Sequence, residues 1–331
     1  MRTHRGEAAG FWTVGLSTGG ARVVPMPFDD TLLDNPHAQR VHRLAELQDR
    51  RARQRHGRFL IEGPQSVREA VRWRPDLLTD LYVQADESSS VDKGGHPRPL
   101  NETVGAIMEQ ARELPDCYGH FVSARVMHAI SGNAQGILAQ ARTDGFLAQA
   151  TDLDDPRSLT GEGPDLVAAF WQIRDPGNAG TVMRTADAAG CRAVVLVDQC
   201  VEPTNPKVIR STAGSAFHIP LATMGTEDFL ALCRQQGRAM VAADVYGTPD
   251  KPVRSLNDLM ASGALSKTDT AGQPMALLFG NEARGLPNDL LQSMDQIVRI
   301  PIYGRAESLN LATSAAVLLY AMAMSSRIER M

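Results

Sequence analysis

The chain has 331 residues, enough for two domains at roughly 100 to 200 residues each, which excludes a single small module. Hydrophobic residues make up 43% and charged residues 22%, an ordinary globular composition that excludes a chain disordered throughout. The formal net charge is -4, so any nucleic-acid function must come from a local basic patch and not from the total charge.

The cysteines and the hydropathy pattern exclude several classes of protein. The four cysteines show no C-x-x-C spacing and no nearby His pair, which predicts neither a zinc site nor a disulfide framework. No apolar run approaches the roughly 18 residues of a membrane span, and the first residues lack the apolar core of a signal peptide. We therefore expect a cytoplasmic protein without a metal and without membrane contact.

The first part of the chain predicts a small α/β unit. Residues 1–30 show no sustained periodicity and are interpreted as a flexible extension, and a unit of alternating strands and helices follows over 31–142. Within it, 40–58 carries seven arginines against two acidic residues, with apolar residues at helical spacing. Without a ligand, this segment would be a solvated charged helix.

A linker rich in Asp, Thr, Gly and Pro, residues 143–164, separates this unit from a second domain over 165–331. Strands and helices alternate there, and 246–274 reads as a polar insertion with a short helix. Such alternation predicts a mostly parallel sheet with helices on both faces. The strands are expected at 166–173, 193–197, 239–245, 275–279 and 297–302, and the helices at 179–189, 206–213, 226–236 and 308–327.

Three polar, glycine-containing loops follow strands of the second domain, where parallel sheets bind their ligands. The first contains Asn178, which would otherwise be a helix cap, and Arg184, a charged side chain among apolar neighbours that needs a partner such as an RNA phosphate. The second contains Gly280 and Glu282 and would otherwise be an ordinary turn. The third contains Ser308, whose alternative role is again a helix cap.

Taken in order, these loops resemble a known family. N-x-G-x-x-x-R at 178–184, FGNE at 279–282 and IP-x-x-G-x-x-x-SLN at 300–310 resemble the three motifs of the SpoU/TrmH branch of the SPOUT RNA methyltransferases. The run N-P-H-A-Q-R-V-x-R-L from Asn35, followed by G-R-F-L-I-E-G at 57–63, is similar to the RNA-binding domain that many members carry at their amino terminus. One departure is Ala283 and Arg284, where members often have glycine after the glutamate.

The resemblance implies a fold and an assembly. It implies a C-terminal SPOUT domain with a deep trefoil knot, an exception to the rule against threaded chains, beside a small N-terminal α/β domain that binds structured RNA. It also implies a homodimer through the SPOUT domain, with each active site built from both subunits, and S-adenosylmethionine as cofactor, with no metal.

The resemblance also implies site residues. The catalytic set would be Asn178, Arg184, Glu282, Ser308 and Asn310. The cofactor would be bound by Phe279, Gly280, Asn281, Ile300, Ile302, Gly304, Ser308 and Leu309. RNA would be bound by Arg40, Arg43, Arg50, Arg51, Arg53, Arg55, Arg58 and Arg210.

The implied reaction is methyl transfer to a ribose 2'-hydroxyl, with ribosomal RNA favoured over transfer RNA as substrate. A guanidinium with a pKa above about 12 is a poor base, so Arg184 is expected to bind the adjacent phosphate and stabilise the developing alkoxide. Ser308 and Asn310 would position the ribose, and Glu282 would orient Arg184 or Asn310. The alternative is a non-catalytic RNA-binding or ribosome-assembly protein, which has no need for all five catalytic groups.

Overall fold

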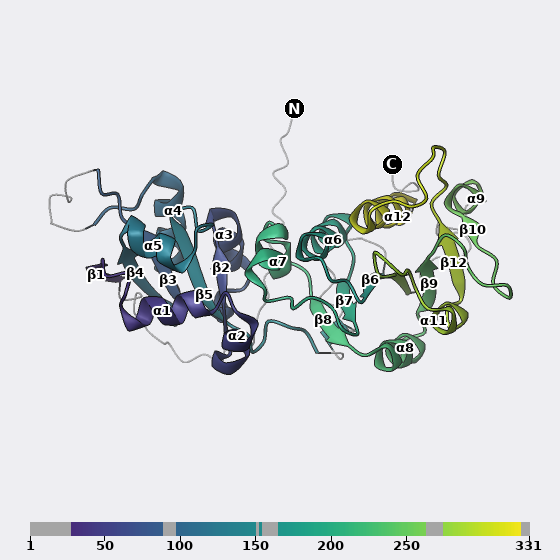
Figure 1. The fold of residues 1–331 in the computed structure, drawn as a ribbon, viewed down its shortest axis with the longest axis horizontal. Helices are drawn as coiled ribbons and strands as arrows, with labels where there is room; N and C mark the ends of the chain where they lie inside the picture. The colour runs from purple at the N-terminus through teal and green to yellow at the C-terminus, as the bar shows by residue number, and fades with distance from the viewer. Residues whose placement is uncertain (1–27, 89–96, 150–151, 154–164, 263–273, 326–331) are drawn as a thin grey trace, which may run out of the picture.

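The structure is a computed structural model, and it describes residues 28–88, 97–149, 152–153, 165–262 and 274–325. Two α/β units lie side by side along the long axis of the molecule (Figure 1). Each unit has its own sheet, and helices pack on both faces of each.

The N-terminal unit is built on a five-stranded mixed sheet of order β1-β4-β3-β5-β2. Helices α3 and α4 cover one face, whereas α1 and α5 cover the other. The strands are β1 (Phe28–Leu33), β2 (Arg58–Glu62), β3 (Leu78–Gln84), β4 (Tyr118–Val122) and β5 (Ile137–Arg142). The helices are α1 (Gln39–Glu46), α2 (Arg50–His56), α3 (Pro64–Trp73), the 3-10 helix η1 (Pro75–Leu77), α4 (Glu102–Ala111) and α5 (Ala124–Ile130).

Two features of this unit differ from the sequence expectation. Strand β1 pairs with β4 and begins at Phe28, inside the expected extension, while the remainder of that extension, 1–27, lies outside the described residues. The basic segment forms two helices instead of one. The side chain of Asp49 accepts a hydrogen bond from the Arg51 backbone N–H at 2.7 Å, so a new helix starts there after the first has ended.

The C-terminal unit is built on a seven-stranded sheet of order β10-β12-β9-β11-β6-β7-β8, and its pairs are parallel. The strands are β6 (Leu166–Trp171), β7 (Ala193–Val197), β8 (Leu221–Met224), β9 (Ala239–Ala243), β10 (Arg254–Ser255), β11 (Met275–Phe279) and β12 (Gln296–Arg299). The helices are α6 (Pro176–Ala189), α7 (Pro206–Ser211), η4 (Ser215–Phe217), α8 (Thr226–Gln235), α9 (Leu256–Ala261), α11 (Asn288–Gln292) and α12 (Leu311–Ser325).

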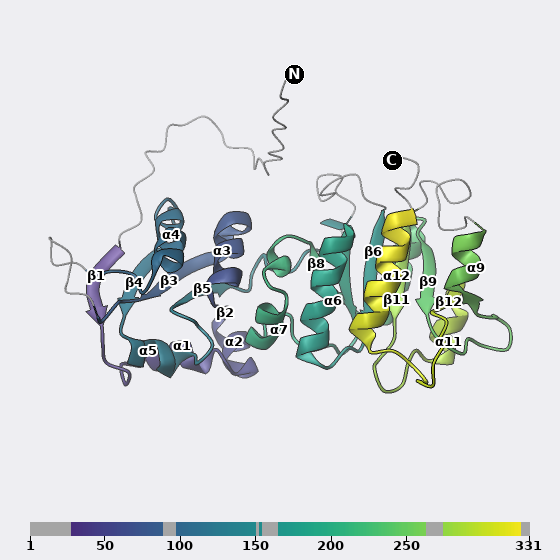
Figure 2. The ribbon, with the colours of Figure 1, turned by 90° about the horizontal axis from the view of Figure 1, so that it is seen from above.

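Helices lie on both faces of this sheet. Helices α6, α9 and α12 pack on one face, whereas α8 and α11 pack on the other. Figure 2 shows α6 and α12 side by side in front of the strands. The predicted parallel α/β architecture is therefore confirmed. The threading of the chain, and with it the trefoil knot, stays a prediction.

The two units share one hydrophobic core across their boundary. Phe146 lies in the expected linker and packs between Phe59 of the first unit, at 4.9 Å between ring centroids, and Phe217 of the second, at 6.2 Å. Ion pairs also cross the boundary, from Arg53 to Glu202 at 2.6 Å and from Arg210 to Glu62 at 2.5 Å. The described part of the linker is thus packed against both units.

His218 of the C-terminal unit lies between two carboxylates, one from each unit. Its Nδ1 lies 2.9 Å from Asp187 Oδ2 on α6, and its Nε2 lies 3.3 Å from Glu69 Oε2 on α3, which Arg68 also contacts. Burial opposes the charged imidazolium, but the hydrogen bonds and the negative charges of Asp187 and Glu69 outweigh burial and raise the pKa of His218.

This raised pKa predicts a pH-dependent stability. A histidine whose pKa is higher in the folded state than in the unfolded state stabilises the folded protein. This contribution to the free energy of unfolding is fully present below the unfolded pKa of about 6.5, and it is lost as the pH rises through the folded pKa. Urea unfolding of the wild type and of His218→Gln is therefore expected to show a difference in free energy of unfolding that shrinks on going from about pH 6 to about pH 9. A difference that stays constant over this range would contradict the assignment.

Candidate active site

A cavity of about 560 Å³ opens at the carboxyl ends of strands β9, β11 and β12. Its walls come from the loops that follow these three strands and from the beginnings of α6 and α12. Ligands of parallel sheets bind at this edge, and the volume falls in the usual range of about 300 to 1,000 Å³ for small-ligand pockets. The cavity is therefore the candidate active site.

The loop after β11 is a tight closed turn. The Asn281 N–H donates to Gly285 O at 3.2 Å, the Gly285 N–H donates to Asn281 O at 2.9 Å, and the Asn281 side chain donates to Gln172 O at 2.8 Å. A Cβ on Gly280 would lie 2.5 Å from the Gly285 carbonyl carbon, so only glycine fits there. This turn holds Glu282 at the cavity.

Three side chains from the three motif loops form one hydrogen-bonded chain in the cavity. Asn310 Nδ2 donates to Asn178 Oδ1 at 3.2 Å, and Asn178 Nδ2 donates to Glu282 Oε1 at 3.3 Å. The fold thus joins the residues 178, 282 and 310, as the combined motifs predicted. Glu282 contacts Asn178, however, and not Arg184 or Asn310, which corrects the expected partner of this carboxylate.

The capping alternatives for Asn178 and Ser308 are wrong. Helix α6 is capped by Asp175, whose side chain accepts from the Asn178 N–H at 2.7 Å, and Pro176 occupies the first turn. At α12, Asn310 Oδ1 accepts from the Ala312 N–H at 2.9 Å. Ser308 lines the cavity instead, so its hydroxyl is available to a ligand.

Arg184 lies outside this group. It is exposed on α6, does not line the cavity, and has no hydrogen bond or ion pair with any residue that the structure describes. Its apolar neighbours Val182, Met183 and Ala186 are buried on the other side of the helix. The expectation of a charge surrounded by apolar groups was therefore wrong, because consecutive helical residues point to different faces.

Most of the expected cofactor residues line the cavity; Gly304 does not. Those that do are Phe279, Gly280, Asn281, Ile300, Ile302, Ser308 and Leu309. Sequence reasoning missed the residues that follow β9, Asp244 and Tyr246, as well as Glu307 in the third loop. The position of Asp244 directly after a strand, at the edge where the other loops end, was the signal that could have found it.

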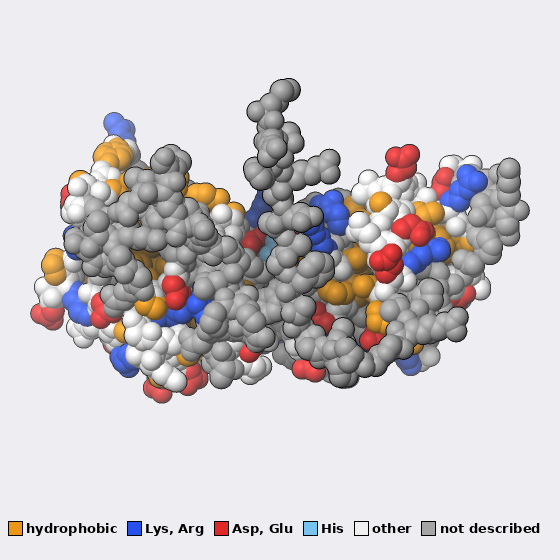
Figure 3. Space-filling model, turned by 180° about the vertical axis from the view of Figure 1, so that it is seen from behind, with side chains coloured by type: hydrophobic (Ala, Val, Ile, Leu, Met, Phe, Trp, Pro, Cys, Tyr) orange, Lys and Arg blue, Asp and Glu red, His pale blue; other side chains and the backbone are white. Residues whose placement is uncertain are grey.

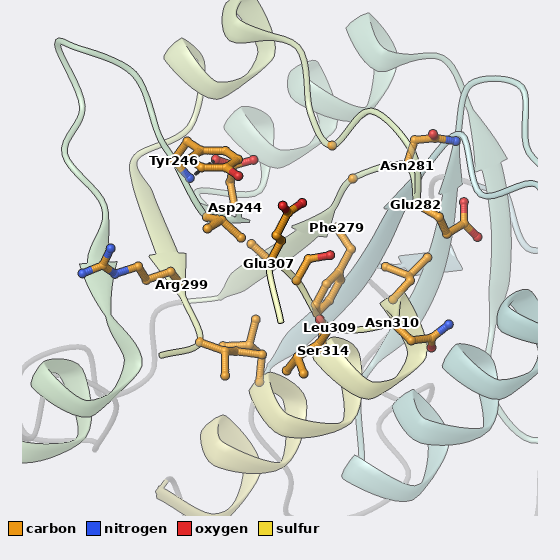
Figure 4. A pocket seen from close by; sticks show the side chains of 18 of the residues that line it. Asp244, Tyr246, Phe279, Asn281, Glu282, Arg299, Glu307, Leu309, Asn310 and Ser314 are labelled. Carbon is orange, nitrogen blue, oxygen red and sulfur yellow. Dashed lines mark hydrogen bonds between the residues drawn. The ribbon is translucent and has the colours of Figure 1, made fainter. Parts of the chain in front are cut away.

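The lining suits a ligand with an apolar part and a positive charge. Figure 4 shows Glu282 and Asn310 on one side of the cavity, Asp244 and Tyr246 on the other, and Glu307 between them. Three acidic residues, Asp244, Glu282 and Glu307, therefore line the cavity beside apolar residues such as Phe279 and Leu309, whereas Arg299 points away from the other labelled side chains (Figure 4). S-adenosylmethionine, with its adenine ring and positive sulfonium, fits this donor set.

The expected RNA-binding arginines fall into distinct environments. Five are exposed, namely Arg40, Arg43, Arg50, Arg51 and Arg55. Of these, Arg40 pairs with Asp80 and Arg55 with Glu46, whereas Arg58 is partly buried. Among the side chains coloured in Figure 3, blue and red are interspersed, without a broad field of one sign.

Two of the eight arginines form ion pairs between the two units instead. Arg53 is only 1% exposed, donates to Leu47 O and Gln48 O at 2.9 Å, and pairs with Glu202 through two hydrogen bonds. Arg210 pairs with the buried Glu62. Their phosphate contacts are therefore not supported, because both guanidinium groups are engaged across the boundary between the two units.

Two further findings concern metals and membranes. Within the described part of the chain, no three His, Cys, Asp or Glu side chains gather as a metal site would require. No helix in the same residues combines the length and the apolar character needed to cross a bilayer.

Comparisons with known proteins agree with the motifs. Residues 165–320 match the SpoU rRNA Methylase family, and residues 38–139 match the MRM3-like substrate binding domain. A 23S rRNA (guanosine-2'-O-)-methyltransferase of Ralstonia nicotianae is 33% identical over 56% of this chain and 68% of its own. A 23S rRNA (guanosine(2553)-2'-O)-methyltransferase of Bacillus subtilis is 29% identical over 87% of this chain and 97% of its own.

A solved structure extends the similarity to nearly the whole fold. The S-adenosylmethionine-bound rRNA methyltransferase of Sinorhizobium meliloti is 26% identical, with a TM-score of 0.67 over 88% of this chain and 97% of its own. The order of the motif loops, the cavity that they line and these matches lead to one conclusion. The chain belongs to the SpoU rRNA methylase family of SPOUT RNA methyltransferases, and its cofactor is S-adenosylmethionine.

Proposed function

We propose that this chain transfers a methyl group from S-adenosylmethionine to the 2'-hydroxyl of a ribose in ribosomal RNA. The observation that carries the proposal is the chain Asn310–Asn178–Glu282, which lies in the same cavity as the cofactor loops. The names of the Ralstonia and Bacillus relatives support both the ribose hydroxyl and the ribosomal RNA.

The residues of the cavity position the reacting hydroxyl. S-adenosylmethionine supplies an electrophilic methyl group, so the protein has to align the ribose oxygen and assist the loss of its proton. Asn310 and Ser308 hydrogen-bond the ribose, while Glu282 fixes the amide of Asn178 so that its orientation does not change when RNA binds. Asn178 thereby also holds the side chain of Asn310.

Arg184 acts from a second copy of the chain. It cannot serve the cavity of its own subunit as placed, but α6 packs along α12, which exposes an apolar stripe at Val317, Tyr320 and Met324. These residues recur at helical spacing and are 38%, 41% and 59% exposed, as expected for a surface that another protein covers. A two-fold dimer through this stripe brings Arg184 to the partner's site, where it binds the RNA phosphate and stabilises the developing alkoxide.

The two units divide the work. Residues 31–142 select structured RNA, and residues 165–331 carry the methyl transfer, in the cytoplasm where ribosomal RNA is found. All four cysteines, Cys117, Cys191, Cys200 and Cys233, are unpaired thiols, which supports a reducing compartment.

Methyl transfer from labelled S-adenosylmethionine to purified ribosomal RNA tests the proposal. The wild-type protein is expected to label ribosomal RNA at one ribose, whereas Asn310→Ala is expected to bind both substrates and label little. Labelling of transfer RNA alone would contradict the ribosomal substrate. Absence of labelling, together with no heat of S-adenosylmethionine binding in calorimetry, would support the non-catalytic RNA-binding protein instead.

A further inference from the structure

A second cavity, of about 330 Å³, lies in the N-terminal unit, apart from the candidate active site. Helix α1, the end of α2 and strands β2, β3 and β5 supply its walls. The lining residues are Arg40, Arg43, Leu44, Leu47, His56, Arg58, Asp80, Tyr82 and Gln140. The lining thus contains three arginines and a histidine but one carboxylate, that of Asp80.

Hydrogen bonds hold Arg40 and Asp80 together in one wall of the cavity. Arg40 Nη2 donates to Asp80 Oδ1 at 2.8 Å, and its Nε donates to Tyr82 Oη at 3.0 Å. His120 Nε2 lies 3.1 Å from the same carboxylate oxygen of Asp80. Burial would raise the pKa of Asp80, but its hydrogen bond to His120 and the charge of Arg40 lower it, so the carboxylate stays ionised and paired.

Arg43 and Arg58 keep donors for a ligand. Among the described residues, Arg43 has no hydrogen bond or ion pair, and Arg58 donates to Gly57 O alone, at 3.2 Å. A guanidinium presents five N–H donors in a planar fork that suits phosphate oxygens. Of the lining residues that the structure describes, Asp80 carries the one carboxylate, and it is already paired. The positive charge that remains on the lining therefore selects an anion.

The cavity also holds a group that suits the edge of a nucleobase. The Gln140 side chain offers both an amide donor and an acceptor, whereas Leu44, Leu47 and Tyr82 are at most 3% exposed and shape the cavity without offering a broad apolar face. A phosphate alone would leave most of about 330 Å³ unfilled, whereas a nucleotide also brings a base to Gln140.

We propose that this cavity holds one unpaired nucleotide of the RNA substrate, with its phosphate on Arg43 and Arg58 and the edge of its base on Gln140. The proposal rests on the proposed function. Figure 2 shows α1 and α2 on the same side of the molecule as the loop that joins β12 to α12, so one RNA molecule can reach both cavities. The other arginines of the basic segment then add general attraction only.

A matched pair of variants tests this inference. Arg43→Gln/Arg58→Gln removes two charges that line the cavity, and Arg51→Gln/Arg55→Gln removes two from the same segment outside it. With a ribosomal RNA transcript, we expect the first variant to weaken binding by about 10-fold or more and the second by less than about 3-fold, because fixed contacts cost more than diffuse charge. The cavity variant should also raise KM without changing kcat at saturating RNA.

Cross-linking tests the nucleotide itself. A transcript carrying 4-thiouridine is expected to cross-link under ultraviolet light to the peptide spanning 39–58 in the wild type and in the control variant, but not in the cavity variant. Equal losses of affinity in the two variants, or cross-links that persist in both, would overturn the inference. The proposed function is judged separately, from the wild-type protein alone. It stands if the wild-type protein methylates ribosomal RNA, even when the cavity inference is overturned, and it fails if the wild-type protein transfers no methyl group. Thermal melting of all variants shows that each is folded.

Discussion

Replacing Arg184 by alanine is expected to lower the rate of methyl transfer by about 10²- to 10³-fold, the usual cost of removing a donor that stabilises transition-state charge. Affinity for S-adenosylmethionine should stay nearly unchanged, because Arg184 does not line the cavity. The free energy of unfolding should change by less than about 0.5 kcal/mol, because the side chain is exposed and none of the described residues binds it. Single-turnover methylation, calorimetry and urea unfolding measure the three quantities.

Mixing two inactive variants tests where Arg184 acts. Arg184→Ala and Asn310→Ala are each expected to be nearly inactive, but a dimer of one copy of each contains one complete site if Arg184 serves its partner. Equal mixing under exchange conditions should then restore about a quarter of the wild-type rate, because half of the dimers are mixed and each has one intact site. No recovery above the separate variants would place Arg184 in the site of its own subunit. Unchanged turnover of Arg184→Ala alone would remove this residue from the reaction.

Gly280→Ala is expected to weaken S-adenosylmethionine binding by about 10- to 100-fold, equivalent to the roughly 1 to 3 kcal/mol that overpacking costs. The added Cβ would lie 2.5 Å from the Gly285 carbonyl carbon and 2.8 Å from the Leu286 nitrogen. Both contacts are backbone atoms of the closed turn, so the loop itself must move. Calorimetric titration with S-adenosylmethionine measures the loss.

Gly304→Ala is the matched control for this substitution. Gly304 lies in the third loop, and a Cβ there would meet no atom within 4 Å. The control is therefore expected to bind S-adenosylmethionine as the wild type does. Weakened binding in Gly304→Ala would show that this residue contacts the cofactor after all, as its motif position predicted, and normal binding in Gly280→Ala would show that the turn adapts.

The elements of the second domain could be predicted well because their hydrophobic periodicity is strong. The apolar run 193–197 is β7, and the helix ending at Gly190 is α6, whose C-cap has the expected left-handed glycine with φ of 73°. Strand β8 was missed, since Leu221–Met224 has only four residues and no alternation. In the first unit, β1 was missed because it falls in a stretch without a periodic pattern.

The site could be predicted as a set of loops but not as a set of contacts. Motif order identified Asn178, Glu282 and Asn310, yet their hydrogen bonds join residues more than 100 positions apart and depend on the folded backbone. The same limit applies to Arg53. Its neighbours in the sequence do not show that it faces Glu202, 149 residues away, and therefore belongs to the structure and not to the RNA surface.

Mapping of 2'-O-methylated riboses in ribosomal RNA, from cells with and without the gene, tests the central claim most directly. We expect one ribose to lose its methyl group when the gene is absent and to regain it with the wild-type gene, but not with Asn310→Ala. Ribosomal RNA whose methylated positions are identical in all of these cells would contradict the assignment of this chain as a ribosomal RNA 2'-O-methyltransferase.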